Sequence, residues 1–226
     1  MKVEAGATSM SEELSAAATE QGFDSSDDDS GEVDLSPLDI SWLDLTCYGF
    51  ESPVGITSLP GCRFKDVWRS LENDIKCLVS EEVQDVYCLC SKGELTKYRV
   101  QWLLHELSGA GFTVHHFPFP DGQPPTTAQL MKIIEELKIS LNNKRKSIIH
   151  CYGGLGRSCV VGACFLLSLD SEITPEKAIE KMKELRGPRA VQTVKQFNFI
   201  NEFPQTLADF QRESEDMEIK GRSLSR

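Results

Sequence analysis

Residues 147–159 read Ser-Ile-Ile-His-Cys-Tyr-Gly-Gly-Leu-Gly-Arg-Ser-Cys, and this stretch decides the fold. A β-branched apolar run leads into it, and an apolar run over residues 160–169 follows it. This order predicts a strand, a glycine-rich loop and a helix. Backbone N–H groups in such a loop turn toward one point at the helix N-terminus, where the helix dipole favours negative charge. The stretch therefore predicts an anion cradle.

Cys151 and Arg157 stand at the two ends of this loop. The cradle favours the thiolate of Cys151, because a free-thiol pKa of about 8.5 falls to roughly 3.5–7.5 in such surroundings. Arg157 adds a planar fork that suits two phosphate oxygens. We interpret the pair as the centre of a covalent phosphate-ester hydrolysis. An inert cysteine at a tight turn is the alternative, but it leaves the three glycines and the arginine unexplained.

The string from His150 to Ser158 resembles the active-site signature of protein tyrosine and dual-specificity phosphatases, His-Cys-x2-Gly-x2-Arg-Ser/Thr. The resemblance implies that Cys151 is the nucleophile and that the loop holds the substrate phosphate. In this interpretation Ser158 donates a hydrogen bond to the Cys151 thiolate, and His150 organises the loop. The predicted phosphate-binding residues are Tyr152, Gly153, Gly154, Leu155, Gly156 and Arg157.

The same resemblance suggests an acid and a water-binding pair. The family carries an aspartate on a mobile loop ahead of the cysteine, and Asp121 lies in such a place, within the proline-rich stretch 117–125. A simple Asp-Gly turn is the alternative. Gln192-Thr-Val-Lys-Gln196 resembles the family motif Gln-Thr-x-x-Gln, whose amides orient a water molecule. Here the alternative is a polar start to a helix.

Cys90 ends a strand that we expect beside the Cys151 strand, and related phosphatases carry a cysteine there that pairs with the nucleophile. We hypothesise a reversible disulfide between Cys90 and Cys151, with a small core residue as the alternative. We predict no cofactor and no metal site. The adjacent His115 and His116 lie on a predicted strand, where neighbouring side chains face opposite sides.

Strands alternate with helices along the chain, which predicts one α/β domain with a largely parallel central sheet flanked by helices, the fold of the dual-specificity phosphatases. Pro204 should kink or restart the last helix. The predicted strands cover residues 39–45, 85–90, 112–117 and 147–150, and the predicted helices cover residues 65–80, 96–107, 126–141 and 174–186, with a last one beginning near Gln192.

The charge of the chain is concentrated at one end. Residues 1–44 hold 12 of the 35 acidic side chains and one of the 24 basic ones, so they alone account for the net charge of −11. We predict a disordered acidic tail over 1–37, a phosphatase domain over 38–213 and a flexible C-terminal tail over 214–226. The tail is either a solvated segment or, at Ser25 and Ser26, a target of an acidophilic kinase.

Composition excludes several function classes. No basic stripe suggests nucleic-acid binding, and no apolar run of about 18 residues suggests a membrane span. Without a signal-peptide pattern, we interpret the eight cysteines as reduced thiols, most of them buried. We expect a monomer located in the cytoplasm, with a perinuclear position implied by the resemblance to known phosphatases.

Strings along nearly the whole chain resemble the kinase-associated phosphatase (cyclin-dependent kinase inhibitor 3) family, in the dual-specificity branch of the protein tyrosine phosphatase superfamily. Among them are Ile40-Ser-Trp-Leu43, Leu59-Pro-Gly-Cys62 and Lys97-Tyr-Arg-Val100. The resemblance implies removal of the activation-loop phosphothreonine of a cyclin-dependent kinase and so restraint of the cell cycle. The uncharged loop 152–156 favours a phosphoprotein over an inositol lipid. A kinase-binding module in which capture matters more than catalysis is the other alternative.

Overall fold

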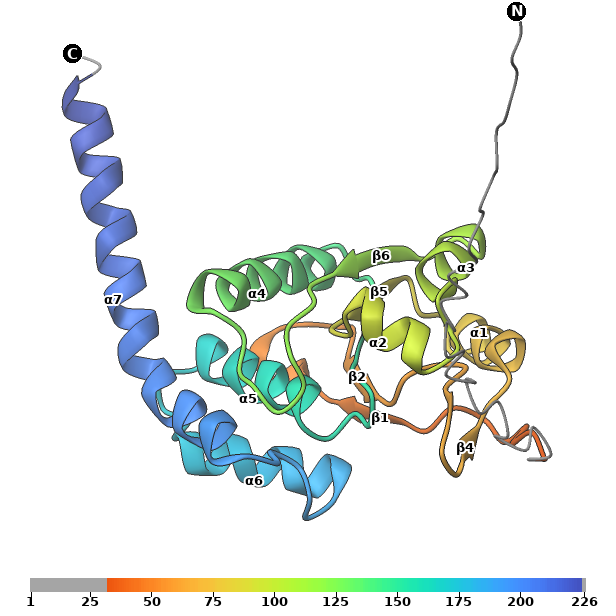
Figure 1. Ribbon diagram of the computed structural model, residues 1–226. Coiled ribbons are helices and arrows are strands. Elements are labelled where there is room, and N and C mark those ends of the chain that lie inside the picture. The colour runs from red at the N-terminus through yellow and green to blue at the C-terminus, as the bar shows by residue number, and fades with distance from the viewer. Residues whose placement is uncertain (1–31, 225–226) are drawn as a thin grey trace, which may run out of the picture. The chain divides into compact units, whose positions relative to one another are not determined.

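The computed structural model describes residues 32–224, with side chains as far as residue 213 (Figure 1). Five strands form one sheet in the order β1-β2-β7-β5-β6. β1 is antiparallel to β2, and all the other neighbours are parallel. The predicted α/β fold with a largely parallel sheet is therefore confirmed. The strands are β1 Ile40–Leu43, β2 Val54–Thr57, β5 Asp85–Cys88, β6 Thr113–His116 and β7 Ser147–His150.

Helices cover both faces of the sheet (Figure 1). One apolar core lies under α1, α2 and α3, and a second lies under α4, α5, α6 and α7. Ile148 of β7 belongs to the first core and Ile149 to the second, as expected where successive side chains alternate between the faces of a strand. The helices are α1 Leu71–Ser80, α2 Lys92–Lys97, α3 Leu103–Gly109, α4 Thr127–Asn142, α5 Arg157–Leu169, α6 Pro175–Arg186 and α7 Val194–Leu224.

The predicted helix over residues 65–80 begins later than expected. β3 Arg63–Phe64 and β4 Val67–Trp68 form a small hairpin, and α1 starts only at Leu71. Lys65, with a positive φ of 54°, makes the hairpin turn, and the Ser70 side chain caps α1 by accepting from the Asn73 N–H. The apolar spacing of Val67 and Trp68 was compatible with both structures.

The predicted helix over residues 96–107 is two helices. α2 starts earlier, at Lys92, because Ser91 and Glu94 form a capping box. Arg99, with a φ of 58°, then turns the chain before α3 begins at Leu103. A short 3₁₀ helix over Thr46–Tyr48 lies between β1 and β2.

The last helix runs past the proline. α7 continues through Pro204 without restarting, and its backbone is helical to Leu224. The kink at Pro204 and the domain bounds stay predictions. Ile200 and Phe203, which precede Pro204, are buried in the second core, and Leu207 packs against the same core beyond the proline. The acidic tail, with Ser25 and Ser26, lies outside the described residues. None of the helices in the described part of the chain is long and apolar enough to cross a bilayer.

Candidate active site

The predicted cradle forms where β7 meets α5. Cys151 directly follows β7 and is 2% exposed, and α5 begins at Arg157 with Gly156 as its N-cap. The loop between them is fixed from two sides. The N–H of Leu59 donates to the carbonyl of Tyr152 at 3.0 Å, and the N–H of Val191 donates to that of Leu155 at 2.9 Å. The cysteine thus lies at the floor of a loop whose backbone is held in place.

Two glycines of the loop have no room for a side chain. Gly154 has a φ of 66°, and a Cβ there would lie 2.5 Å from the carbonyl oxygen of Thr57. A Cβ on Gly156 would lie 2.8 Å from Gln192 Oε1 and 3.0 Å from Gln196 Nε2. The first glycine is required by backbone conformation and the second by the close approach of the two amides. This explains part of the glycine pattern that the sequence singled out.

Arg157 is completely buried in a cage of acceptors. Its two terminal nitrogens bind the Glu94 carboxylate at 2.9 and 2.7 Å, and Nη1 also donates to the carbonyls of Leu89 and Phe119 at 3.1 and 3.0 Å. Burial acts to lower the pKa of Arg157, but the bonds to Glu94 and the nearby Cys151 sulfur raise it overall. The arginine therefore stays charged and fixed in orientation inside the protein.

Glu94 is a site residue that the sequence analysis missed. Burial acts to raise its pKa, but hydrogen bonds from Arg157 and from the Ser91 N–H outweigh burial and hold the pKa below its ordinary value. The Ser91–Glu94 capping box was visible in the sequence as Ser-x-x-Glu. That pattern predicts a helix start, whereas the partner of Glu94 lies 63 residues further along the chain.

Asp121 reaches the cradle from the loop between β6 and α4. Its Oδ1 lies 3.3 Å from Nε of Arg157, and its side chain is 59% exposed. The hydroxyl of Thr193 donates to the carbonyl of Gly122 at 2.8 Å, which ties this loop to the start of α7. The structure therefore brings together Asp121, Arg157 and Cys151, as the sequence predicted. The carboxylate is at once near the arginine and open to a substrate.

The two predicted amides meet the loop from the other side. The backbone N–H of Gln192 donates to Gln196 Oε1 at 2.9 Å, and both side chains pack against Gly156. Val191, which precedes them, has a φ of 61°, a strained value for a β-branched residue. The strain is located where the chain must turn both amides toward the cradle.

Buried polar atoms without a hydrogen-bond partner are concentrated at this site. In the part of the chain with described side chains they are both ring nitrogens of His150, Arg157 Nε, Ser158 Oγ and Gln196 Nε2. Each such atom costs free energy and therefore calls for an explanation. Four of the five atoms lie within the signature 150–158, and the fifth packs against its loop. The Arg157–Asp121 pair lacks hydrogen-bond geometry, so the Nε–H is available to another acceptor.

Cys90 lies close to the site as predicted. Its sulfur is 4.0 Å from Arg157 Nη2, and both Cys90 and Cys151 are buried free thiols. A hydrogen bond with the Cys88 thiol and burial both raise the pKa of Cys90. All eight cysteines are free, and six of them are buried. The Cys90–Cys151 disulfide stays a prediction.

The two adjacent histidines have separate partners. His115 binds Asp85 at 2.9 Å and Glu136 at 2.6 Å, while His116 binds the carbonyl of Cys90 at 2.8 Å. Among residues 32–224, no cluster of three or more histidine, cysteine or acidic side chains is arranged to hold a metal ion.

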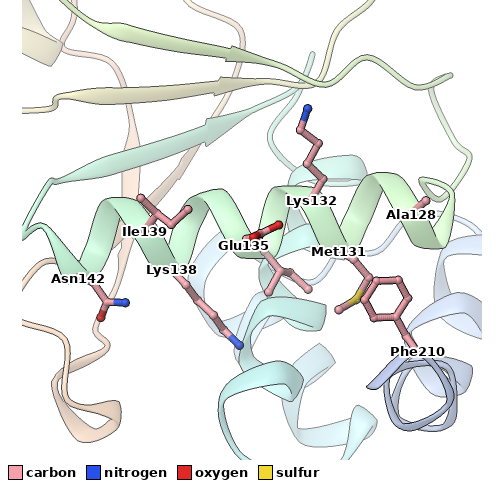
Figure 2. Close-up of a pocket in the computed structure, with 9 residues that line it drawn as sticks. Ala128, Met131, Lys132, Glu135, Lys138, Ile139, Asn142 and Phe210 are labelled. Atoms are coloured by element: carbon pink, nitrogen blue, oxygen red, sulfur yellow. The ribbon is translucent and has the colours of Figure 1, made fainter. Parts of the chain in front are cut away.

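Two hollows differ in their relation to this chemistry. The larger, about 670 Å³, lies between α4 and Phe210 of α7 and contains none of the predicted site residues (Figure 2). A hollow of about 540 Å³ lies between α2 and the Asp121 loop and is lined by Glu94 and Asp121. The second hollow therefore adjoins the site, and the first does not.

A largely parallel sheet that delivers a buried cysteine into a glycine loop, with an arginine at the start of the next helix, defines the fold class of the protein tyrosine phosphatase superfamily. Solved structures agree. A structure of kinase associated phosphatase, with its catalytic site cysteine replaced by serine, is 46% identical and superposes with a TM-score of 0.75, covering 77% of this chain and 98% of that one. The active form of Tk-PTP gives 26% identity and a TM-score of 0.59 over 74% and 96% of the two chains.

Sequence comparison identifies the family within this class. The family model for cyclin-dependent kinase inhibitor 3 matches residues 10–179. The chain is 46% identical to cyclin-dependent kinase inhibitor 3 of Sus scrofa over 90% of its length and 95% of the relative's, and 47% identical to that of Homo sapiens over 82% and 88%. The chain belongs to the cyclin-dependent kinase inhibitor 3 family and is a dual-specificity protein phosphatase. The resemblance inferred from sequence strings is confirmed.

Proposed function

We propose that the protein hydrolyses phosphate monoesters on a protein substrate through a phosphocysteine intermediate. The observation that carries this proposal is the concentration of unpartnered buried polar atoms around Cys151. Arg157 Nε and the loop N–H groups provide donors for phosphate oxygens, and Ser158 Oγ provides one for the sulfur. The Cys151 thiolate attacks phosphorus, the sulfur–phosphorus bond forms, and the bond from phosphorus to the substrate oxygen breaks.

The departing oxygen needs a proton, and Asp121 is the proposed acid. Its carboxyl group is more than half exposed and lies beside the arginine that holds the phosphate. In the second step a water oxygen attacks phosphorus and the sulfur–phosphorus bond breaks, which returns the thiolate and releases inorganic phosphate. Gln192 and Gln196, which pack against the loop at Gly156, are the proposed groups that orient this water.

For the substrate, we propose the activation-loop phosphothreonine of a cyclin-dependent kinase. The names of the relatives, cyclin-dependent kinase inhibitor 3 and kinase associated phosphatase, support a kinase partner. The absence of any charged side chain at positions 152–156 favours a phosphoprotein over a multiply phosphorylated inositol lipid. A cyclin-dependent kinase phosphorylated on its activation loop is therefore the first substrate to test.

The test compares wild type with Cys151→Ser on that phosphorylated kinase and on an inositol phospholipid. We expect wild type to release phosphate from the kinase at least 10³-fold faster than Cys151→Ser, because a serine hydroxyl is a much weaker nucleophile than the Cys151 thiolate. Equal rates for the two proteins would refute catalysis and favour a module that only captures the kinase. Faster release from the lipid than from the kinase would refute the proposed substrate class.

A further inference from the structure

Three carbonyls of the glycine-rich loop are held from outside the loop. Those of Tyr152 and Leu155 accept backbone N–H groups of neighbouring segments at 3.0 and 2.9 Å. The third, on Gly154, accepts from the side chain of Arg186, whose Nε lies 3.3 Å away, and the Cys159 thiol adds a longer contact of 3.5 Å. Arg186 is the last residue of α6, and its side chain is 7% exposed. A largely buried, charged side chain therefore anchors the middle of the loop.

The direction of each carbonyl sets the direction of the N–H that follows it. A trans peptide group is planar, and its C=O and N–H point opposite ways. Carbonyls held on the outside therefore turn the N–H groups of Gly153, Leu155 and Gly156 toward the inside of the loop. In the described part of the chain, no backbone N–H from residue 152 to residue 156 donates to a protein acceptor. These donors are thus available to the oxygens of a bound phosphate.

The peptide group after Gly154 depends on its anchor more than the other two do. Gly154 has a φ of 66°, and a glycine restricts the orientation of its peptide group only weakly. The guanidinium that holds its carbonyl is itself fixed, because Nη1 donates to Asp39 at 2.9 Å and to the Ser41 hydroxyl at 3.1 Å. Both partners lie at β1, on the far side of the arginine's planar fork. The fork therefore transmits the position of β1 to the loop.

We propose that Arg186 is a positioning residue for catalysis. By holding the Gly154 carbonyl outside the loop, it keeps the N–H of Leu155 directed at the phosphate, and it does not touch the substrate itself. This inference rests on the proposed phosphocysteine mechanism, in which the loop N–H groups bind phosphate oxygens. The alternative is an arginine that only ties α6 to β1.

The first experiment measures oxyanion binding, which needs no turnover. Tungstate, a tetrahedral phosphate analogue, is titrated by calorimetry into the full chain as wild type, Arg186→Met and Asp39→Ala. Arg186→Met keeps the length of the side chain but removes the donor to Gly154, so binding should weaken about tenfold, roughly the worth of one charge-assisted hydrogen bond. Asp39→Ala removes only an 83% exposed partner of the same guanidinium, so binding should stay within about twofold of wild type. Equal affinities in wild type and Arg186→Met, or equal losses in the two variants, would overturn the proposal.

Two further readouts separate positioning from a loss of structure. Tungstate should shift the amide proton of Leu155 downfield in wild type and shift it less in Arg186→Met, while the amide of Gly153, which has a different anchor, responds equally in both. On a phosphothreonine peptide, kcat/KM should fall about tenfold in Arg186→Met and stay within about twofold in Asp39→Ala. A Leu155 shift of wild-type size in Arg186→Met would refute the positioning role.

Arg186→Lys keeps the test decisive if circular dichroism shows that Arg186→Met does not fold. Lysine retains the charge but has one nitrogen in place of the fork, so it cannot hold Gly154 and Asp39 together. Its tungstate affinity should fall by roughly twofold to tenfold. Wild-type affinity in the folded lysine variant would overturn the proposal.

Failure of the proposed function gives a different result from failure of this inference. If wild type neither binds tungstate nor hydrolyses phosphothreonine, the proposed mechanism fails and the positioning role fails with it. If wild type does both and Arg186→Met matches it, the proposed function stands and only the positioning role is refuted.

Discussion

Arg69 and Arg157 are both buried, and each forms an ion pair with a carboxylate, but the two arginines differ in whether all their nitrogens have hydrogen-bond acceptors. Arg69 binds Asp74 through Nε and Nη2 at 2.6 to 3.2 Å, and its terminal nitrogens also reach Asp34 at 2.9 Å and the carbonyl of Ser36 at 2.7 Å. Every nitrogen of Arg69 therefore has an acceptor. Arg157 is held as firmly at its tip, yet its Nε has no hydrogen-bond partner.

The difference separates a structural arginine from one prepared for a ligand. Arg69 joins the segment 34–36 to α1, and its donors are saturated by the protein itself. Arg157 has its tip fixed by Glu94 and two carbonyls, while its remaining donor, Nε, lies near Asp121 without a hydrogen-bond partner. Leaving a buried donor unpaired costs free energy, so the arrangement is expected where a substrate oxygen completes it.

The largest expected effect comes from replacing each arginine by lysine. Arg157→Lys should lower kcat/KM on a phosphothreonine substrate about 10³-fold, because a lysine cannot hold Glu94 and a phosphate oxygen with one planar fork. Arg69→Lys should leave kcat/KM of the folded enzyme within about twofold while lowering its stability. Steady-state kinetics with the folded fraction measured by circular dichroism would check both. Comparable activity losses in the two variants would contradict the distinction.

Replacing the carboxylate partner of each arginine should show the same separation between an effect on stability and an effect on activity. Asp74→Asn should lower the free energy of unfolding by about 3 kcal/mol, since it leaves the buried Arg69 charge without its 1% exposed partner. Glu94→Gln should instead lower kcat/KM about tenfold, because the tip of Arg157 loses its fixed orientation. Urea denaturation and kinetics on both variants provide the comparison. A larger activity loss in Asp74→Asn than in Glu94→Gln would reverse the assignment.

Replacing Asp121 tests whether this carboxylate, which lies beside Nε of Arg157, donates a proton or only positions the arginine. Asp121→Asn should slow hydrolysis of phosphothreonine about 10²-fold, because the alkoxide leaving group needs a proton. The loss should be much smaller for an aryl phosphate with an acidic leaving group, which departs without one. Rates for both substrates on wild type and the variant would show the contrast. An equal loss on both substrates would mean that Asp121 positions Arg157 rather than donating the proton.

The sequence predicted the cradle well because its determinants are local. Cys151, the glycines and Arg157 lie within one strand–loop–helix unit, so their order alone specifies their geometry. The contact of Glu94 with Arg157 spans 63 residues and leaves no periodic trace. Val67 and Trp68 were assigned to a helix because their spacing suits a helix as well as a hairpin; the turn at Lys65 decided between them. Long-range partners and ambiguous short runs are thus where the structure was needed.

A third charged cluster lies at the start of β5 and the end of β6. Like Arg69, its central residue, His115, has all its hydrogen-bonding groups paired within the protein, but His115 can also gain or lose a proton. His115 lies between Asp85 and Glu136, stacks on Tyr87 with centroids 4.2 Å apart, and shares Asp85 with Arg145. Burial acts to lower the pKa of His115, but the two carboxylates outweigh it and raise the pKa above the ordinary 6.5. The cluster is saturated like that of Arg69, so we expect it to affect stability and not turnover.

The sign of this effect follows from the raised pKa. The ion pairs of His115 contribute fully to stability below about pH 6.5, where His115 is charged in both folded and unfolded chains. This contribution is lost as the pH rises through the folded-state pKa of His115. The stability difference between wild type and His115→Gln should therefore shrink, by roughly 1 kcal/mol or less, between pH 6 and pH 9. The exposed His105→Gln is the matched control, and thermal unfolding across this range is the measurement. A difference that grows with pH would show that the folded protein favours the neutral imidazole, which would mean that burial outweighs the two carboxylates.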